Sequence, residues 1–162
     1  MPEGTLTKQL TALLATAETL NNASNSINTI LLAVEEQLMK ANIGLEVWLP
    51  CPPYPLSCST PKPIDGGDGI CYWRVELGFA KVGDAWHFAA RDFFVKEGSH
   101  DRDGTPVWTN ESLDRDPYPL AQASRQERIE ALRLLPELIA RLQEEAEKAI
   151  QNIEEAKKLI IC

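Results

Sequence analysis

Apolar residues recur at alternating steps of three and four through the first 42 residues. This spacing keeps the apolar side chains on one helix face and predicts a long amphipathic helix over about residues 5–42. The polar stretch 21–26 is its weak point, because Asn and Ser are poor helix formers. Either the helix breaks there, or Ser24 and the nearby Asn residues set the register of a helix pair. The seam positions, with Ser24 as the one polar member, are Leu6, Leu10, Leu13, Ala17, Leu20, Ser24, Ile27, Leu31, Val34, Leu38 and Ala41.

The same alternation returns at the other end of the chain and predicts a second helix over about residues 125–161. Ser124 and Glu127 have the spacing of a capping box, which places the helix start near Arg125. Pro136 has no amide hydrogen to donate to the preceding turn, so a kink or a restart is expected there. This seam consists of Leu132, Leu135, Ile139, Leu142, Ala146, Ala149, Ile153, Ala156 and Ile160.

Two seams of similar length at opposite ends of a chain predict an antiparallel helix pair. Further apolar residues lie off both seams, and they would cover the sheet or bury against a second copy. The expected assembly is a homodimer joined through its helices, with the character of a coiled coil.

Between the helices, about residues 44–110 carry the signals of a small antiparallel sheet of three or four strands. The alternating segments 72–82 and 85–95 flank Gly83-Asp84, which has the length of a tight hairpin turn. A two-residue turn pairs Phe79 with Phe88 and Glu76 with Arg91. Residues 50–69 hold six of the eleven prolines, so this stretch is predicted to be a long loop.

The pleat of this hairpin divides its side chains between two faces. The predicted core face carries Trp73, Val75, Leu77, Phe79, Trp86, Phe88 and Phe94. The opposite face is polar, and its charged and hydrogen-bonding side chains form the candidate surface for a partner or a ligand. The residues proposed for that site are Tyr72, Arg74, His87 and Arg91.

The length and the charge of the chain limit the classes of protein to which it can belong. A chain of 162 residues fits one α+β domain, here residues 1–162. The net charge of −8 includes no basic patch, which argues against nucleic-acid binding. No apolar run approaches the roughly 20 residues that cross a bilayer, so no membrane contact is expected. The first residues lack the basic and apolar blocks of a signal peptide, and the expected location is the cytoplasm.

Motifs for catalysis or cofactor binding are missing from the sequence. Cys51, Cys58 and Cys71 lack the close pairing of zinc ligands, and no phosphate-binding loop or nucleophile motif occurs. No metal and no cofactor are therefore expected. His87 is the one candidate acid or base, with Glu76 as a possible partner. The competing interpretation is a surface histidine beside a Glu76–Arg91 ion pair.

The segments 77–86 and 124–131 resemble small bacterial or phage proteins built as strand, turn, strand and helix. That resemblance implies a prokaryotic origin and no activity. The favoured hypothesis is a non-enzymatic interaction or scaffold protein that oligomerises through its helices and meets a protein partner with the polar sheet face. One alternative is a small-molecule or nucleotide binder in which Arg74, His87 and Arg91 hold an anion. A third is an enzyme that uses His87 as acid or base.

Overall fold

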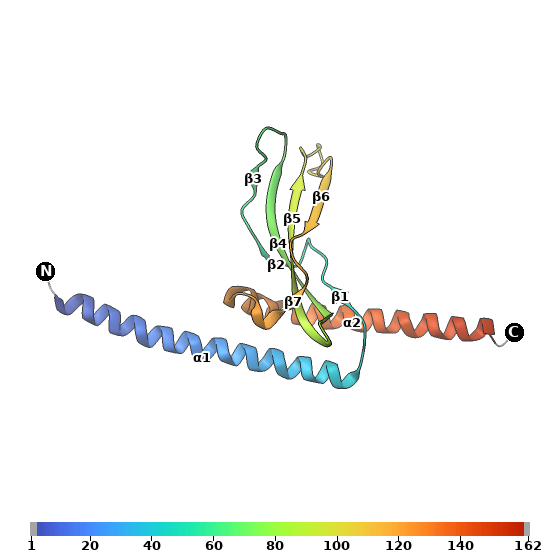
Figure 1. Ribbon diagram of the computed structural model, residues 1–162, viewed down its shortest axis with the longest axis horizontal. Helices are drawn as coiled ribbons and strands as arrows, with labels where there is room; N and C mark the ends of the chain where they lie inside the picture. Colours follow the sequence, from blue (N-terminus) through green and yellow to red (C-terminus); the bar gives the residue numbers. More distant parts are fainter. Residues whose placement is uncertain (1–2, 161–162) are drawn as a thin grey trace.

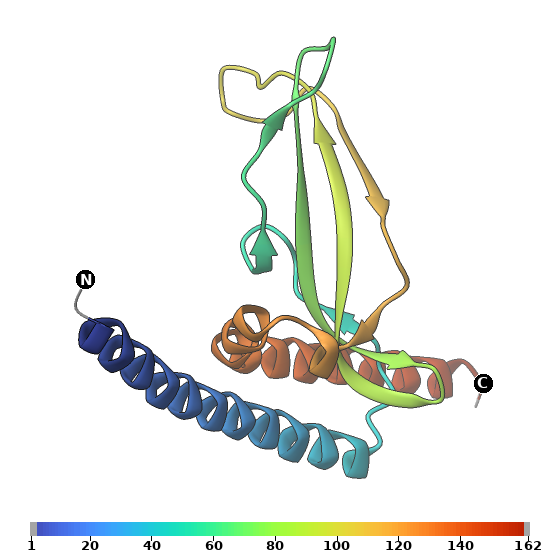
Figure 2. The same ribbon diagram turned by 60° about the vertical axis from the view of Figure 1, so that its left-hand side comes forward.

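The computed structural model describes the backbone of residues 3–160 and the side chains of residues 5–159. The predicted α+β class is confirmed: two long helices carry an antiparallel sheet that projects from them (Figures 1 and 2). The elements are α1 (Glu3–Ala41), β1 (Val47–Trp48), β2 (Pro55–Cys58), β3 (Lys62–Pro63), β4 (Ile70–Val82), β5 (Ala85–Glu97), β6 (Thr109–Leu113), β7 (Tyr118–Pro119), the 3-10 helix η1 (Leu120–Gln122) and α2 (Arg125–Ile160). The predicted end of the second helix at residue 161 lies outside the described residues.

The sheet has seven strands rather than three or four. Its main path, β1-β4-β5-β6, has the expected size, but β2 and β3 also pair with β4, and β7 pairs with β5. Both β2 and β3 come from the proline-rich stretch that was predicted to be loop. They form because proline is tolerated in edge strands, where no neighbour needs its missing amide hydrogen.

The β4–β5 hairpin is the longest element of the sheet, and its predicted register is confirmed. Phe79 pairs with Phe88 and Glu76 with Arg91 around the turn at Gly83-Asp84. Each strand has 13 residues and extends beyond the predicted ends, to Ile70 and Glu97. β6 starts at Thr109 and pairs with the far part of β5.

Both helices are continuous through the positions where a break or a restart was considered, residues 21–26 of α1 and Pro136 of α2. α1 passes through residues 21–26 without a break, and Ser24 there is buried. Arg128 of α2 lies 3.4 Å from the Ser24 hydroxyl, and Arg125 donates to the Asn21 side chain at 2.8 Å. α2 continues through Pro136 as one helix, so it kinks rather than restarts; its first turns lie at an angle to the remainder (Figure 2).

The two helices pack together as predicted, but they run in the same sense and not antiparallel. Residue 21 meets residue 125 and residue 24 meets residue 128, so the contacting segments run in the same sense. The first turns of α1 and the last turns of α2 consequently lie at opposite ends of the molecule (Figure 1). The apolar seams of the two helices contact each other over only part of their length, because the sheet occupies the space between the middle parts of both helices.

The core lies where the middle of each helix meets the turn end of the hairpin. Leu77, Phe79 and Phe88 are buried as predicted. Trp73 is 44% exposed, since the far end of the hairpin rises beyond the helices (Figure 2). The main contributors from the helices are Leu31, Ala131, Leu135, Leu138 and Leu142. Within residues 3–160, no helix has an apolar segment long enough to cross a membrane.

The predicted capping box is present at the start of α2. The Glu127 amide donates to the Ser124 hydroxyl at 3.2 Å, and the Ser124 amide donates to the Glu127 carboxylate at 2.8 Å. The same carboxylate accepts the Ser57 hydroxyl of β2 at 2.8 Å. Burial on its own raises the pKa of Glu127, but these hydrogen bonds outweigh it and lower the pKa below its ordinary value.

The lowered pKa of Glu127 predicts a specific pH dependence of stability. The contribution is fully present above the carboxyl's ordinary pKa and is lost as the pH falls through the lowered folded value. We expect Glu127→Gln to lower the free energy of unfolding at neutral pH by about 0.5–1.5 kcal/mol, and the difference from wild type to shrink on acidification. Urea titrations across pH measure this. Glu130→Gln is the control on the same helix, and an unchanged difference in acid would contradict the prediction.

Candidate functional site

The four residues proposed from the sequence do not form one open surface. Arg74 and Arg91 share the carboxylate of Glu76, Tyr72 bonds elsewhere, and His87 contacts α1 instead of its own sheet. The polar face is also less exposed than expected, since Arg74 is only 6% exposed. The segment of β1 covers part of it: the Trp48 ring packs so closely on Gly78 that a Cβ at this position would clash with it.

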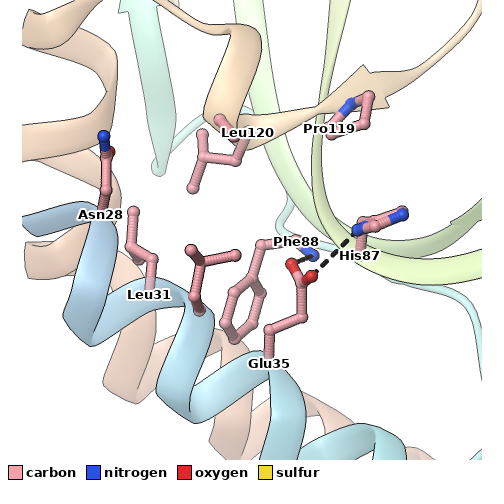
Figure 3. Close-up of a pocket in the computed structure, with 9 residues that line it drawn as sticks. Asn28, Leu31, Glu35, His87, Phe88, Pro119 and Leu120 are labelled. Carbon is pink, nitrogen blue, oxygen red and sulfur yellow. Dashed lines mark hydrogen bonds and ion pairs between the residues drawn. The ribbon is translucent and has the colours of Figure 1, made fainter.

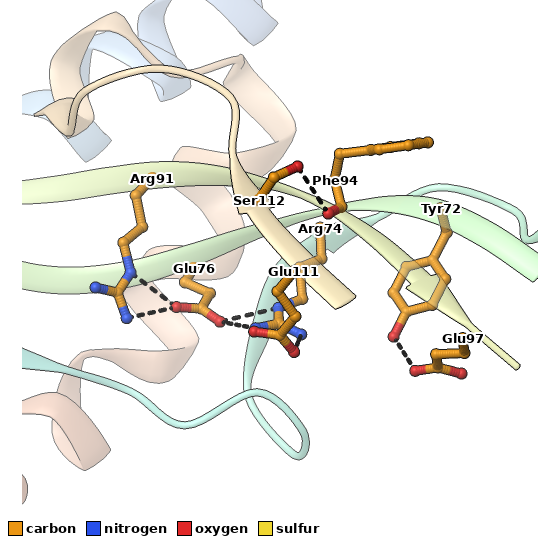
Figure 4. A network of polar contacts seen from close by, with 8 residues as sticks. All are labelled: Tyr72, Arg74, Glu76, Arg91, Phe94, Glu97, Glu111 and Ser112. Atoms are coloured by element: carbon orange, nitrogen blue, oxygen red, sulfur yellow. Dashed lines mark hydrogen bonds and ion pairs between the residues drawn. The ribbon is translucent and has the colours of Figure 1, made fainter. Parts of the chain in front are cut away.

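Arg74, Glu76, Arg91 and Glu111 form a continuous network across β4, β5 and β6 (Figure 4). Glu76 accepts Arg74 Nε at 2.9 Å on one oxygen and Arg91 Nε at 2.8 Å on the other. Arg74 also binds Glu111 with two parallel bonds of 2.7 and 2.9 Å. The Arg91 guanidinium lies 4.1 Å from the centre of the Trp48 ring. Both guanidinium groups are therefore engaged by carboxylates and rings of this same chain.

Electrostatics keep Arg74 charged. Burial alone lowers the pKa of Arg74, but the hydrogen bonds and charges of Glu111 and Glu76 outweigh burial and raise it above its ordinary value. Nearby, the Tyr72 hydroxyl donates to Glu97 at 2.7 Å. Burial and that bond raise the pKa of Tyr72 to about 12, so the phenol stays neutral. An external anion would have to displace Glu76 or Glu111 to reach these arginines.

His87 forms the second polar site, with a partner from α1 that sequence reasoning missed (Figure 3). Its Nδ1 lies 2.9 Å from one oxygen of Glu35, and the Phe88 amide donates to the other at 2.8 Å. Glu35 is 8% exposed, and it occupies the edge of β5 beyond the end of β7. A carboxylate only accepts hydrogen bonds, so Nδ1 is the donor of this pair.

A cavity of about 190 Å³ lies beside this Glu35–His87 pair, between α1, β5 and the β7–η1 segment (Figure 3). Its walls are mostly apolar. Asn28 contributes a buried side-chain oxygen that has no hydrogen-bond partner among the described residues. No serine, threonine or cysteine lines the cavity, so no side-chain nucleophile of those types stands next to His87. The lining consists of Asn28, Leu31, Leu32, Glu35, His87, Phe88, Pro119, Leu120 and Ala121.

The far end of the hairpin presents a half-exposed aromatic surface, which we call the distal face. It consists of Trp73 and Phe94, whose ring centres are 4.8 Å apart, and of Lys96, whose ammonium lies 5.6 Å from the Phe94 ring. A hollow of about 420 Å³ beside these rings is bordered by Ser59, Thr60 and Lys62. This surface lies on the predicted core face, where the helices do not reach it.

Both helices expose large apolar side chains. We call residues 5–23 of α1 and residues 143–159 of α2 the two arms, because they extend past the body in opposite directions (Figure 1). The arms continue the same seams that are buried in the body. Their large exposed side chains are Leu6, Leu10, Leu13, Leu14, Leu20, Ile150, Ile153 and Leu159.

In the part of the chain that the structure describes, no three histidine, cysteine, aspartate or glutamate side chains are grouped as a metal site. Cys51, Cys58 and Cys71 are free thiols, and burial raises the pKa of Cys51 and of Cys58. Neither the grouping of these side chains nor the three thiols indicates a cofactor. In comparisons with protein-family models, curated proteins and solved structures, nothing matches this chain, so the arrangement of its own residues is what indicates a function.

Proposed function

We propose that this chain is a non-enzymatic scaffold protein that self-associates through its two arms and displays the projecting sheet to a protein partner. The observation that carries the proposal is the exposure of eight large apolar side chains on the arms. Exposed apolar surface of this kind is typical of protein–protein contact sites. Leu10 is 53% exposed although it lies on the same seam as the buried Leu31.

The polar groups of the α1 arm support the same function. Only Lys8 and Glu18 are charged between residues 5 and 23. The hydroxyls of Thr11, Thr16 and Thr19 donate to carbonyls one turn back, at 2.9–3.1 Å, rather than projecting into water. A helix face so poor in charge gains more from burial against another helix than from hydration.

A second copy related by a two-fold axis fits both arms at once. Because the arms leave the body in opposite directions, the rotation lays the α1 arm of one copy beside the α2 arm of the other. At 1.5 Å per residue the arms are about 28 and about 25 Å long, so they match in length. The helices in each of these two contacts run antiparallel, and the contacts are identical, as a closed dimer requires.

The expected energy of this contact is sufficient for a stable dimer. Fully burying a leucine or isoleucine contributes about 1.5–3 kcal/mol. Eight such side chains in each copy, most of them about half exposed, therefore offer about 12–24 kcal/mol. This exceeds the roughly 8 kcal/mol of a micromolar complex before ordering costs are subtracted. The distal face stays open in this arrangement and is the surface offered to the partner.

Charge inserted into the seam of the α1 arm tests the proposal. We expect Leu10→Glu with Leu13→Glu to raise the dimer dissociation constant by more than about 100-fold, since each change loses well over 1.4 kcal/mol. Light scattering coupled to size exclusion and sedimentation equilibrium measure the mass at each concentration. Ile153→Glu on the α2 arm should have the same direction of effect.

The matched control places the same charges on the opposite side of the arm. Ala12→Glu with Ala15→Glu has the same net charge as the seam variant and keeps the helix, but it leaves the seam intact. Its dissociation constant should therefore stay within about threefold of wild type. A wild-type monomer at tens of micromolar would overturn the proposal. So would binding of the wild-type arm to neutral lipid vesicles without self-association, which would identify a membrane surface as the occupant.

A further inference from the structure

We propose that the distal face recognises an extended acidic segment of a partner protein, with an aromatic side chain between its carboxylates. This inference rests on the proposed function, in which the distal face meets a protein partner, and it names the chemistry of that partner. The face consists of Trp73, Phe94 and Lys96, and Lys62 borders the hollow of about 420 Å³ beside the rings. Trp73 is 44% exposed, so its ring is open to a second aromatic group.

The strand register places the two lysines on the same face as the aromatic pair. Lys62 of β3 and Lys96 of β5 both pair with Cys71 of β4, so these three residues form one row across the sheet. Neighbouring strands are about 4.8 Å apart, which puts the two lysine backbones about 10 Å apart. Trp73 and Phe94 form the next row, about 7 Å along the strands. One aromatic contact and two positive charges therefore lie within the span of a short peptide.

Neither lysine has an acidic partner within the described part of the chain. Exposed lysines of the helices do have one: Lys40 and Lys157 each bind a glutamate of their own helix. Lys96 contacts only the Phe94 ring, and no ion pair joins it or Lys62 to a described carboxylate. In a chain with a net charge of −8, this face thus carries positive charge that its own residues leave uncompensated.

The glutamates nearest to these lysines along the strands serve the opposite face of the sheet. Glu97 directly follows Lys96 and accepts the Tyr72 hydroxyl at 2.7 Å, and Glu111 binds Arg74. Successive side chains of a strand point to opposite faces, so neither carboxylate lies on the distal face. Carboxylates of a partner therefore reach both ammonium groups without displacing an existing ion pair, unlike an anion at the arginine network.

Single-stranded nucleic acid also combines negative charge with rings, but it fits this face less well. Its charges continue along the whole strand, whereas a short peptide confines them to the two lysines. The connections that surround the far end of the hairpin are acidic, and they would repel the rest of a nucleic-acid strand (Figure 2). Their acidic residues are Asp65, Asp68, Asp101 and Asp103.

The direct test uses three five-residue peptides with blocked ends. The first has a tryptophan between two pairs of glutamates, the second has alanine at its centre, and the third has lysines in place of the glutamates. We expect the first to bind the full-length protein with a dissociation constant of about 1 mM or below. The alanine peptide should bind at least about threefold more weakly, because it lacks the ring contact, and the lysine peptide should not bind. Chemical-shift changes at the Trp73 indole and the Lys96 amide report the location.

Reversing the two charges gives a result that loss of structure does not produce. Lys62→Glu with Lys96→Glu should weaken the acidic peptide by at least about tenfold and allow the lysine peptide to bind instead. Both side chains are exposed, so the variant should fold. Lys40→Glu with Lys81→Glu makes the same change in net charge at exposed positions outside the distal face. This control should bind the acidic peptide within about twofold of wild type, because salt screens distant charges.

Self-association and peptide binding fail independently. Leu10→Glu with Leu13→Glu should bind the acidic peptide with wild-type affinity, so a monomeric wild type that binds it would contradict only the role of the arms. Equal affinity for the three peptides, no binding up to about 10 mM, or shift changes away from Trp73 would overturn the proposal. Tighter binding of a five-nucleotide thymidine oligomer than of the acidic peptide would overturn it as well and identify nucleic acid as the occupant.

Discussion

Replacing Glu76 with glutamine should lower the free energy of unfolding by about 3–5 kcal/mol, because it removes a buried carboxylate shared by two arginines. Arg91 then loses its carboxylate, and Arg74 keeps only Glu111. Glu76 is 3% exposed, and its carboxylate binds both Arg74 and Arg91. Glutamine keeps the shape but has no negative charge and one acceptor instead of two. Urea unfolding followed by circular dichroism measures the change.

Two further variants separate charge from packing at this position. Glu154→Gln removes the same charge from an exposed pair with Lys157, so its effect should stay below about 1 kcal/mol. Replacing Arg74, Glu76 and Arg91 together with Met, Leu and Met should recover most of the stability lost in Glu76→Gln, since no uncompensated charge is left among the three. A loss below about 1 kcal/mol for Glu76→Gln itself would show that water reaches the network.

The same substitution at two positions of the α1 seam should have very different results. We expect Leu31→Ala to cost about 2–5 kcal/mol at any protein concentration, because Leu31 is 6% exposed and packs in the core. Leu10→Ala removes the same atoms from the arm. In dilute protein, where the monomer dominates, its cost should be below about 0.5 kcal/mol.

The comparison becomes informative when the protein concentration is varied. A self-associating arm makes the apparent stability of wild type rise with concentration, and Leu10→Ala should weaken that rise while Leu31→Ala preserves it. Thermal unfolding over a hundredfold range of concentration distinguishes the two. If Leu10→Ala were as costly as Leu31→Ala in dilute protein, the arm would have a partner within its own chain.

The hairpin and the capping box were predictable because they depend on residues close together in the sequence. A two-residue turn at Gly83-Asp84 leaves only one register for the strands beside it, and Ser124 lies three residues before Glu127. The continuity of α1 follows from its long seam. These features depend on local geometry, which periodicity reports directly.

The exposure of each sheet face was not predictable in the same way. The alternation of the strands separates the two faces, but it does not show how far the helices extend along them. Trp73 therefore lies at the surface, and Arg74 is buried under segments from elsewhere in the chain. The sequence likewise does not show whether the two helices run parallel or antiparallel, because the long connection through the sheet permits both directions.

The Glu35–His87 pair is the contact that the sequence was least able to predict. The two residues are 52 positions apart, and Glu35 lies next to the seam residue Val34 in a stretch typical of a solvated helix face. Only the docking of α1 against the edge of β5 brings them together. A charged residue beside the buried part of a seam was the one available signal, and it did not indicate a partner.

The orientation of the hairpin relative to the arms has a consequence for recognition by a dimer. The hairpin rises to one side of the helices (Figure 2). In the proposed dimer, a two-fold axis along that direction would exchange the arms and point both hairpins the same way, which would make the assembly bivalent. A target with repeated sites would then engage two distal faces, and the second contact would form at a high effective concentration. Weak individual contacts would suffice for tight capture of polymeric or clustered targets.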